Sequence, residues 1–534
     1  MKKNKCQKLI NLFSVFILIC IVLLLTNPGN RSESDDGYAY AYLVKTQSWA
    51  TLFQPRFLLF LPMLKGIYLL LSAVHINIDI HDLMVYFSIA CSAITIIIFY
   101  FFQNVVLNFN KKSSLWGSLF LLFSYGYWRY SVEAEIYTIS NLLCIAVLFV
   151  ILKTIKEQKP KKNNSLAKII WAGILAALSI CVYKPNAIPV IIVFPFIFIL
   201  YKRWNLFFVY GITAVVLFVA IFLILYKVFA PPTTFTAYLL EGSSRSYGSP
   251  LVTVFVVVSN IFSTNFIYGI NTITQFIHNH FPANVITEEI FTAQANGVWN
   301  YIAFSTFILA AIIFAIIFIK NFKNIFSASK TKTGIIFIAW IVCYAAILFY
   351  LDPNSPEPWT MIILPMITLL NIIFIIPLFQ KGNSKLAWLF WGLLILHNYI
   401  GGYKLISSES TDFSVHETGW LVKNSQPGDL ILSLGSRTTL AYIQYNSPSI
   451  ICSPEQSFDS CINLANNCII NGKNIYLTQD IFNTDPAVKF RDSITYSQTK
   501  SFVEKYRQYI QIANPQDSLH QKVYKLTYNG KLEK

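Results

Sequence analysis

The sequence predicts a polytopic α-helical membrane protein, with about eleven transmembrane helices and a small α/β domain at its C-terminal end. Of the 534 residues, 55% are hydrophobic and only 12% are charged, whereas soluble domains carry roughly 25% charged residues. A water-soluble domain of this size cannot bury so much apolar surface, so a bilayer suits most of the chain. After about residue 404, short strand-like runs and turn residues replace the long apolar segments.

Eleven apolar segments are candidates for transmembrane helices, because about 17 to 25 apolar residues cross ~30 Å of hydrocarbon. The first follows a lysine-rich start and precedes Thr26-Asn27-Pro28-Gly29, which contains no small-x-small cleavage site. We therefore expect an uncleaved first helix rather than a signal peptide. The eleven segments are 9–25, 84–107, 115–128, 136–152, 169–183, 187–201, 205–226, 298–319, 333–351, 359–379 and 386–403.

Positive charge gathers at every second junction between these segments. Because lysine and arginine are retained in the cytoplasm, we expect the N-terminus and these junctions inside. After an odd number of helices, the C-terminal domain is expected outside. The net charge of +16 then reflects membrane topology, and we expect no nucleic-acid partner. The junction residues are Lys2, Lys3, Lys5 and Lys8; Lys111 and Lys112; Lys153, Lys156, Lys159, Lys161, Lys162 and Lys168; Lys202 and Arg203; Lys320, Lys323, Lys330 and Lys332; Lys381 and Lys385.

The stretch 251–270 is apolar enough to span the membrane, but a single span there would break the alternation of the lysines. Its polar side chains would also lack hydrogen-bond partners in lipid. We therefore expect an interfacial helix, although a re-entrant helix or a closely paired hairpin would also preserve the topology. The polar residues are Ser259, Asn260, Ser263, Thr264 and Asn265.

Two domains are expected. The transmembrane domain comprises 1–403, with a first external loop at 26–83 and a large external loop at 227–297, and the soluble domain comprises 404–534. Short strands alternate with helices in the second domain, which indicates an α/β fold. It contains no glycine-rich phosphate loop and no catalytic triad. The expected strands are 429–435, 449–452 and 474–478, and the expected helices are 414–425 and 501–511.

Three cysteines fall in this external domain, namely Cys452, Cys461 and Cys468. In an oxidising compartment they could form one disulfide and leave one free thiol, or they could be three small buried residues. The nine cysteines of the chain include no CxxC motif, so we expect no metal site made from cysteine.

The acidic residues show where chemistry is expected. The apolar segments are nearly free of acids, and no polar or charged residue stands out at mid-span. A transporter or pump usually holds ionisable groups there, so the pattern favours a site at the outer face over an ion path. The notable acids fall instead at the external ends of the segments: Asp35 and Asp36, Glu133 and Glu135, Asp352 and Glu357.

Asp35 and Asp36 lie directly after the first apolar segment, and Glu133 and Glu135 lie between the third and the fourth. A carboxylate at the outer surface could accept the proton of an attacking hydroxyl, so all four are candidate catalytic residues. Adjacent acids in a loop are also often merely solvated, or cap the following helix. Glu133 and Glu135 are two residues apart and would diverge on a helix, so only one is expected to face a site.

Four basic residues on the outer side are candidates for binding a lipid phosphate, namely Arg56, Arg129, Lys184 and Arg245. Arg129 could instead pair with Glu133 at the i,i+4 spacing of a helix, and the others could extend to the membrane interface. His75 and His81, with Asp79 and Asp82, are expected to be a solvated cluster rather than metal ligands; a site for a divalent cation is the alternative.

Three stretches together resemble the membrane glycosyltransferases of the GT-C type. They are Gln54–Pro62 after the acidic pair, Tyr127–Tyr137 with Trp128, and Pro356-Glu357-Pro358-Trp359. The resemblance covers roughly residues 1–400 and is to relatives of the protein O-mannosyltransferases and aminoarabinose transferases, within the bacterial branch that includes the DUF2723-type proteins. Gln54 stands where many relatives have a histidine, so a role for this position is not carried over.

The resemblance implies an inverting glycosyltransferase with a polyprenyl-phosphate-linked sugar donor. It places the general base in the first external loop, at Asp35 by preference or at Asp36, and implies that residues 38–49 and 56–71 form helices lying on the membrane. Arg56 or Arg129 would stabilise the leaving phosphate. The acceptor could be a glycan, a lipid or a protein, and we expect the enzyme in a bacterial cytoplasmic membrane.

Two other functions fit the composition less well. A polysaccharide polymerase or ligase would use a large late loop, for which 227–297 with Arg245, Glu288 and Glu289 leaves room. A transporter of lipid-linked glycans would need ionisable residues inside the spans and an internal repeat, and the sequence displays neither. A non-enzymatic membrane scaffold would tolerate changes of Asp35, Asp36 and Glu133.

Overall fold

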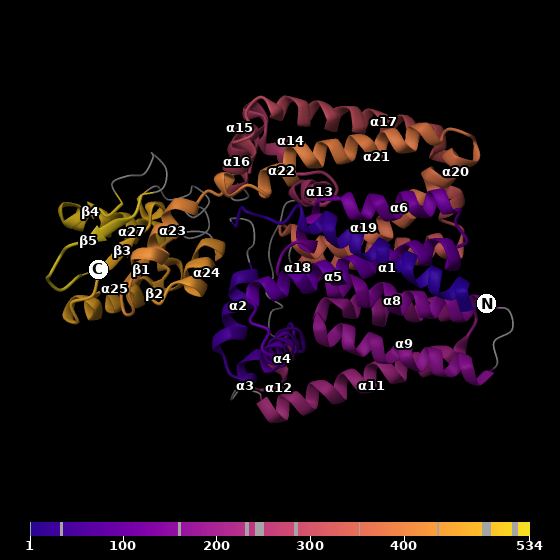
Figure 1. Ribbon diagram of the computed structural model, residues 1–534, viewed down its shortest axis with the longest axis horizontal. Coiled ribbons are helices and arrows are strands. Elements are labelled where there is room, and N and C mark those ends of the chain that lie inside the picture. Colours follow the sequence, from indigo (N-terminus) through magenta and orange to yellow (C-terminus); the bar gives the residue numbers. More distant parts are fainter. Residues whose placement is uncertain are drawn as a thin grey trace. The chain divides into compact units, whose positions relative to one another are not determined.

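The computed structural model describes residues 2–31, 36–157, 162–229, 234–240, 250–281, 287–351, 353–434, 437–482, 493–514 and 522–533 (Figure 1). The chain forms two compact units, each built from segments that are far apart in the sequence. The first comprises Met1–Asn27, Leu43–Ser263 and Ile302–Ile400. The second comprises Pro28–Tyr42, Thr264–Tyr301 and Gly401–Lys534.

The first unit is a bundle of long apolar helices. Among the described residues, seven helical runs are long and apolar enough to cross a membrane: Ile80–Val106, Tyr137–Lys156, Ser165–Val182, Trp204–Phe229, Trp299–Ala328, Lys332–Leu351 and Pro356–Gln380. They contain α5 (Ile80–Phe101), α8 (Tyr137–Lys156), α9 (Lys162–Val182), α11 (Trp204–Phe229), α17 (Trp299–Ala328), α18 (Lys332–Leu351) and α19 (Pro356–Leu370).

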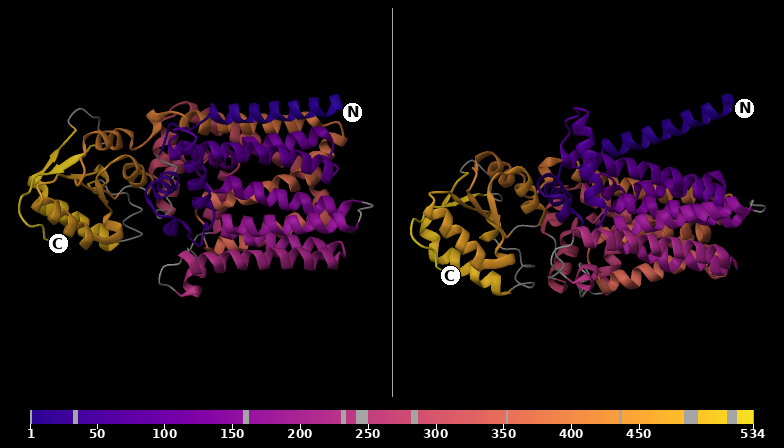
Figure 2. Two further views of the ribbon diagram at one scale, coloured as in Figure 1. Left: turned by 60° about the horizontal axis from the view of Figure 1, so that its bottom comes forward. Right: turned by 90° about the horizontal axis from the view of Figure 1, so that it is seen from below.

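The other four predicted segments are also helical, but they are shorter or interrupted. They correspond to α1 (Lys2–Leu24), α6 (Lys111–Phe123), α10 (Phe194–Leu200) with the irregular helical turns before it, and α21 (Ser384–Asn398). Helices α5, α8, α9 and α11 lie side by side in this order (Figures 1 and 2). The predicted polytopic helical fold is confirmed.

The outermost helices expose their apolar side chains. Only 17% of the apolar window of α11 and 22% of that of α17 is buried, against 67% for α8. A helix that is apolar on all sides is stable in contact with lipid but not with water, and its backbone groups are satisfied within the helix. This exposure is the pattern of a multi-pass membrane protein.

One expectation about the spans is wrong: a polar residue does lie inside one of them. Asn371, within Pro356–Gln380, is fully buried and its Nδ2 donates to Gln103 Oε1 at 2.9 Å and to the Ser113 carbonyl oxygen at 3.2 Å. The amide joins three helical segments of the bundle. Polar side chains inside a membrane protein commonly hold helices together in this way, so Asn371 does not indicate an ion path.

The stretch 251–270 does not form one continuous helix. It contains α13 (Pro250–Ser259), a turn and α14 (Asn265–Tyr268), so it cannot cross the membrane as a single span. The polar residues where the helix breaks have partners: Asn260 Nδ2 donates to the Val256 and Pro356 carbonyl oxygens, and the Ser263 N–H donates to Asn398 Oδ1. The position of α13 at the membrane interface stays a prediction.

The segment 26–83, predicted to be the first external loop, is largely helical, as the resemblance implied. It contains α2 (Gly37–Thr46), α3 (Trp49–Leu52) and α4 (Phe60–Ala73). Its first residues belong to the second unit, because Asn30 Nδ2 donates to the Thr411 carbonyl oxygen at 2.8 Å and to Thr292 Oγ1 at 3.0 Å. The remainder of the second unit includes α15 (Asn271–His280) and α16 (Thr287–Gln294).

The second unit is built on a five-stranded sheet of order β2-β1-β3-β5-β4. The strands β1 (Leu430–Leu432), β2 (Ile450–Cys452) and β3 (Ile475–Leu477) are parallel and were all predicted. The antiparallel strands β4 (Ile510–Ile512) and β5 (Tyr524–Leu526) were not. The predicted helix 501–511 is wrong at its end, because α27 (Ser493–Tyr506) stops before β4 begins.

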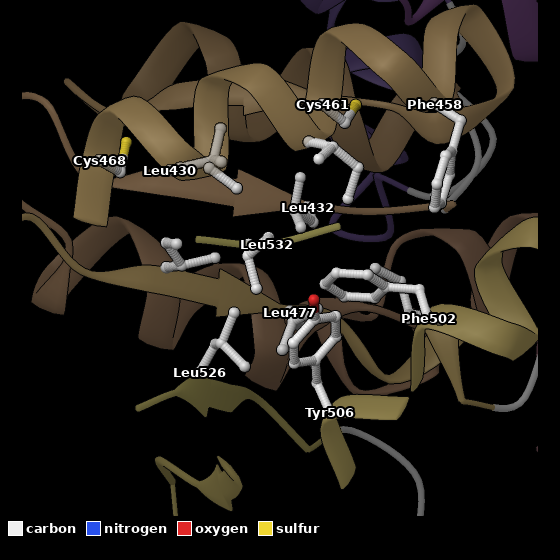
Figure 3. Close-up of a cluster of buried hydrophobic side chains, with 14 of the residues drawn as sticks. Leu430, Leu432, Phe458, Cys461, Cys468, Leu477, Phe502, Tyr506, Leu526 and Leu532 are labelled. Atoms are coloured by element: carbon white, nitrogen blue, oxygen red, sulfur yellow. The ribbon is translucent and has the colours of Figure 1, made fainter. Parts of the chain in front are cut away.

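Helices cover both faces of this sheet. Leu430 and Leu432 point to one face, where α25 (Pro454–Ile470) and α27 pack over them (Figure 3). Ile431 points to the other, against α23 (Val415–Asn424) and α24 (Arg437–Asn446). Successive strand residues alternate between faces, so a strand of three apolar residues is buried on both sides.

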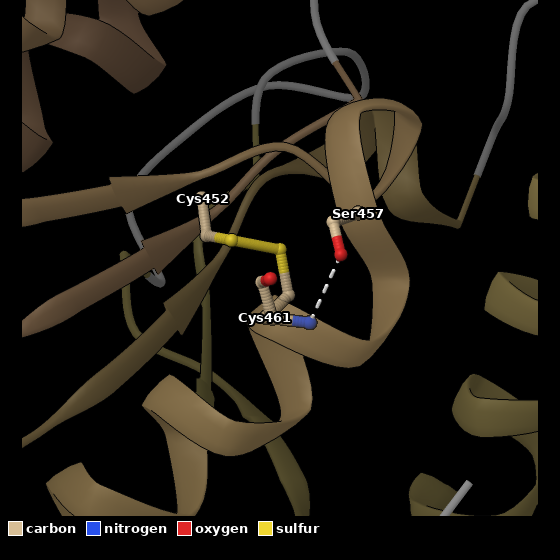
Figure 4. The surroundings of a disulfide bond; sticks show 4 residues. Cys452, Ser457 and Cys461 are labelled. Carbon is tan, nitrogen blue, oxygen red and sulfur yellow. Dashed lines mark hydrogen bonds between the residues drawn. A yellow bond between two sulfur atoms is a disulfide. The ribbon is translucent and has the colours of Figure 1, made fainter.

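A disulfide joins β2 to the helix that follows it. Cys452 and Cys461 are bonded, with their Cα atoms 5.6 Å apart, while Cys468 is a buried free thiol on α25 (Figure 4). Of the two alternatives left open by the sequence, one disulfide with one free thiol is the arrangement found. The Ser460 N–H donates to Ser457 Oγ at 3.2 Å, close to the kink in α25.

Candidate active site

Three of the predicted site residues lie in one short segment of the first unit. Arg129 is on α7 (Tyr125–Ser131), and Glu133 and Glu135 follow it in the link before α8. All three are almost fully buried, with 2%, 2% and 1% of their surface exposed. The expectation that Glu133 and Glu135 diverge on a helix is wrong, because α7 ends at Ser131 and both residues lie beyond it.

Arg129 and Glu133 form a buried ion pair between Nη2 and Oε1. Four residues separate them, so the i,i+4 pairing considered for the sequence does occur. Nine-tenths burial of both partners strengthens the attraction and also makes either charge costly to keep alone. The arginine head group carries its N–H donors in a planar fork, which is a geometry that suits a phosphate.

Hydrogen bonds hold this segment against α5. Ser92 Oγ donates to Ser131 Oγ at 2.7 Å, Tyr127 Oη donates to the Ser92 carbonyl oxygen at 3.1 Å, and Ser88 Oγ donates to the Glu135 carbonyl oxygen at 3.2 Å. On the other side, Gly126 approaches Asn260 so closely that a Cβ at this position would lie 2.1 Å from Asn260 Oδ1. The two acids are therefore carried on a rigid support.

A second part of the cluster comes from α19 and from the first external loop. Tyr137 Oη, at the start of α8, donates to Glu357 Oε2 at 3.1 Å. The Tyr183 hydroxyl is hydrogen-bonded to the side chains of Arg56 and Tyr137. Arg56 in turn accepts, through its carbonyl oxygen, the N–H of Lys184 at 3.2 Å.

Tyrosine rings connect the two parts. The ring of Tyr137 packs edge-on against Tyr130 at 5.7 Å and against Tyr183 at 5.5 Å. Tyr130 lies outside the seven spans, and burial raises the pKa of its hydroxyl well above the ordinary value. The negative charges of Glu357, Glu133 and Glu135 act in the same direction and Arg129 opposes them, so all four charges lie near one phenol.

These residues gather at one end of the helical bundle. They lie after α6 and α9 end and where α8 and α19 begin. The lysine-rich junctions lie at the opposite ends of the same helices, for example at Lys111 and Lys112, where α6 starts, and at Lys153 and Lys156, where α8 stops. The candidate site is thus a cluster of two arginines, three glutamates and three tyrosines, in which Arg56 and Glu357 are half-buried and the other six residues are buried.

Other predicted site residues are not part of this cluster. Asp36 belongs to the second unit, where it precedes α2 and its Oδ2 accepts a hydrogen bond from Tyr40 Oη at 2.7 Å. The Asp36 carbonyl oxygen accepts the N–H of Tyr40. Asp36 therefore takes part in the start of α2, as a capping residue would, through its backbone. Asp35, Arg245 and Asp352 lie outside the described residues.

The histidine and aspartate cluster before α5 has a structural explanation. Asp79 caps the helix by accepting the N–H groups of His81 and Asp82. In the part of the chain that the structure describes, no three His, Cys, Asp or Glu side chains are placed to hold a metal ion together.

The sequence did not identify Tyr130, Tyr183 and Glu357 as members of the site. Tyrosines at helix ends are typical of any membrane interface, and Glu357 was noted only as an external acid in a rigid turn. The contact of Tyr137 with Glu357 joins residues 220 positions apart. The signal that could have singled out Glu357 is its place in the first turn of the largely buried apolar helix α19.

Comparison with known proteins relates this arrangement to a family and to solved structures. Residues 62–206 match the family described as the protein O-mannosyl-transferase TMEM260 N-terminal domain, and these residues include Arg129, Glu133, Glu135 and Lys184. The fold is similar to the crystal structure of ArnT from Cupriavidus metallidurans bound to undecaprenyl phosphate, with a TM-score of 0.56 and 10% sequence identity. The alignment covers 97% of this chain and 98% of that one. The chain has the GT-C fold.

Further structures support the same GT-C fold. The apo form of ArnT matches with a TM-score of 0.57 at 9% identity, covering 98% of each chain. The oligosaccharyltransferase of Archaeoglobus fulgidus, in its complex with Zn and sulfate, matches with a TM-score of 0.52 at 11% identity. That alignment covers 91% of this chain and 71% of the archaeal one. No curated protein sequence matches this GT-C chain. The predicted resemblance to the GT-C type is confirmed.

Proposed function

We propose that this protein is a membrane glycosyltransferase that moves a sugar from a polyprenyl-phosphate donor to an acceptor at the extracytoplasmic face. The observation that carries the proposal is the cluster of buried Arg129, Glu133 and Glu135 with half-buried Arg56 and Glu357 at one end of an apolar bundle. Ionisable groups buried in a membrane protein are expensive and usually functional. The match to an O-mannosyltransferase family and the undecaprenyl phosphate held by the similar ArnT structure support the choice of reaction.

The proposed reaction is a single displacement at the anomeric carbon. The acceptor oxygen forms a bond to this carbon while the bond from the carbon to the phosphate oxygen breaks, so the configuration inverts. The proton of the acceptor hydroxyl passes to a carboxylate, for which Asp35 and Asp36 are the candidates. The bonding electrons leave with the lipid phosphate.

The cations of the cluster have the complementary role in this proposal. Arg56 and Arg129 would stabilise the charge that develops on the leaving phosphate, with Lys184 beside Arg56. Glu133 and Glu357 would keep the two arginine-containing parts oriented through the ion pair and the tyrosine hydroxyls. A dry, preorganised set of donors acts more strongly than the same groups in water.

The proposed location is a bacterial cytoplasmic membrane, with the lysine-rich junctions in the cytoplasm and the second unit outside. The candidate site would then face the compartment in which a lipid-linked donor is presented after transport across the membrane. The acceptor can be a glycan, a lipid or a protein in this scheme.

The proposal is tested by transfer from a panel of radiolabelled polyprenyl-phosphate sugars to membrane extract. Purified wild type is compared with Asp35→Asn and Asp36→Asn, and with Asp459→Asn as a control at an exposed aspartate of α25. We expect wild type and the control to transfer one of the labels, and one first-loop variant to fold normally without transfer. Absence of transfer by wild type, or equal transfer by both first-loop variants, would contradict the mechanism.

A further inference from the structure

A cleft in the second unit is separate from the cluster described above. It has a volume of about 420 Å³, within the range of roughly 300–1,000 Å³ that small-molecule sites occupy. Every residue that lines it belongs to the second unit. The side chains used below are Arg31, Glu409, His416, Trp420, Lys423 and Tyr442, together with Gly419.

One wall of the cleft is the outer face of α23. His416, Gly419 and Lys423 are three and four residues apart, so they follow each other along one side of the helix. Trp420 is partly exposed beside them, and its ring packs edge-on against Tyr476 of β3 at 5.5 Å. The indole is therefore fixed by the sheet while part of it faces the cleft.

A second group of lining residues is aromatic and positively charged. The guanidinium of Arg31 lies 4.3 Å from the centre of the Tyr442 ring, and Tyr38 packs edge-on against the same ring at 5.0 Å. Arg31 is held by an ion pair with Glu409, and its N–H donates to Asp412 Oδ2 at 3.0 Å. The stacked arginine and tyrosine form a preorganised pair.

The charges that line the cleft do not balance. Among the lining residues that the structure describes, Arg31 and Lys423 are positive and Glu409 is negative, which leaves an excess of one positive charge. Among the residues that the structure describes, Lys423 makes no ion pair, so its ammonium group is available to a ligand. A ligand with one negative group would complete the set.

Gly419 keeps the cleft open. A Cβ placed on this residue would have no heavy atom within 4 Å, although the residue sits in the middle of a helix. Glycine weakens a helix interior by roughly 0.5–1 kcal/mol relative to alanine, and at this position it leaves part of the cleft unfilled. A larger side chain can fill this space without displacing any neighbour.

We propose that this cleft binds an acidic sugar residue of the acceptor glycan. Partly exposed aromatic rings suit the apolar face of a sugar ring, while convergent polar and cationic groups suit its hydroxyls and one carboxylate or phosphate. The identification of this glycan as the acceptor rests on the proposed transferase function. The binding step itself needs neither the donor nor the candidate active site.

The test is saturation-transfer NMR with the full chain in detergent micelles, without donor. The probes are a disaccharide that contains glucuronic acid and its neutral counterpart that contains glucose. We expect transfer of saturation to the acidic disaccharide, and about tenfold weaker binding in both Gly419→Leu and Lys423→Ala, which remove space and charge respectively. The matched controls Gly392→Leu, at another helical glycine with open surroundings, and Lys500→Ala, at an exposed lysine of α27, should bind as wild type does.

Three outcomes would overturn this assignment. They are no saturation of either sugar, binding that survives Gly419→Leu, and equal binding of the neutral and acidic probes. The proposed transferase function fails separately, in the radiolabel assay. Binding without transfer would therefore retain the cleft and reject the reaction, and transfer without binding would do the reverse.

Discussion

Arg129 and Glu133 form an ion pair in which both side chains are almost fully buried, at 3% and 2% exposure. Exposed ion pairs contribute little to stability, whereas removing one member of a buried pair leaves an unsatisfied charge in a medium of low dielectric constant. A pair of this kind is a costly way to fix two side chains. It suits a site in which both charges must already be in place when a substrate arrives.

We predict that Glu133→Gln lowers the free energy of unfolding by about 3–5 kcal/mol, because the guanidinium of Arg129 then loses its carboxylate. The double change Arg129→Leu with Glu133→Leu should recover most of this loss while abolishing transfer, since no buried charge of the pair remains. The measurement is thermal unfolding in detergent, followed by tryptophan fluorescence.

The matched control is Glu157→Gln, which breaks the more exposed pair with Lys168 and should change stability by less than about 1 kcal/mol. If Glu133→Gln unfolds at the same temperature as wild type, the ion pair does not make the predicted contribution to the free energy of unfolding.

Individual residues of the site also show which of its contacts could be predicted from the sequence. The pairing of Arg129 with Glu133 follows from a four-residue spacing, and it was foreseen. The contact between Tyr137 and Tyr183 was not, because the fold alone brings their helix ends together. A local sequence pattern predicts contacts between residues of the same helix or strand, whereas this site is formed by residues from several helices.

At the scale of the element, β4 shows where sequence patterns fail. Ile510–Ile512 has only three residues and follows a helical run directly, so the segment was predicted as the end of a helix. It is a strand because β5 pairs with it, from Ile510 with Leu526 to Ile512 with Tyr524. The equally short strands β1 and β3 could be predicted because all of their residues are apolar and buried, whereas the residues of β4 are not fully buried.

A pair of buried carboxyl groups lies beside the sheet. Glu417 on α23 accepts the N–H of Gln479 at 2.8 Å, and Asp480 accepts hydrogen bonds from Ser433 and Thr478. Burial raises the pKa of Glu417 well above its ordinary value, with the charge of Asp480 adding to the effect. Burial also raises the pKa of Asp480 to about 6, against the opposition of these hydrogen bonds.

We predict that the sheet becomes less stable as pH rises. Both folded-state pKa values lie above their unfolded-state values, so the folded form retains protons that the unfolded form has released. The resulting stabilisation is complete below about pH 4 and is lost as pH rises through about 6 and beyond. Hydrogen-exchange protection factors for peptides covering β1 and β3 should fall across this range.

Asp480→Asn and Glu417→Gln together should flatten that dependence, because neither side chain then titrates. His416→Gln, a change at the residue beside Glu417 on α23, is the control and should leave the fall in protection with pH in place. A protection factor that rises with pH in the wild type would reverse the assignment.

At the scale of the whole molecule, the alternating lysines predict which ends of the helices face the cytoplasm. We predict that Lys500→Cys, in the second unit, reacts with a membrane-impermeant maleimide in intact spheroplasts. Lys330→Cys, between α17 and α18, should react only after lysis. Both positions are exposed, so accessibility to the reagent, not burial, decides the result. The wild type, with its own free cysteines, is the background control, and the opposite labelling pattern would invert the topology.

The helical architecture was predictable because a bilayer imposes a length and a composition on every span. All eleven apolar segments are helical in the structure, although α6 and α10 are too short to have been identified by length alone. The composition of the second unit was harder to foresee. This unit combines three distant segments, namely Pro28–Tyr42, Thr264–Tyr301 and Gly401–Lys534. Contacts such as the hydrogen bond between Asn30 and Thr292 connect them, and no local sequence pattern predicts such contacts.

The assembly of the second unit from distant segments has a consequence for the synthesis of the protein. Asn30 donates to the carbonyl oxygen of a residue made 381 positions later, and ribosomes add about 5–20 residues per second. The beginning of the first external loop therefore waits for tens of seconds before its partner exists. During this interval Asn30 and Arg31 remain open to proteases and chaperones. A chain that ends before residue 411 lacks this partner, so the second unit can be completed only after most of the protein has been synthesised.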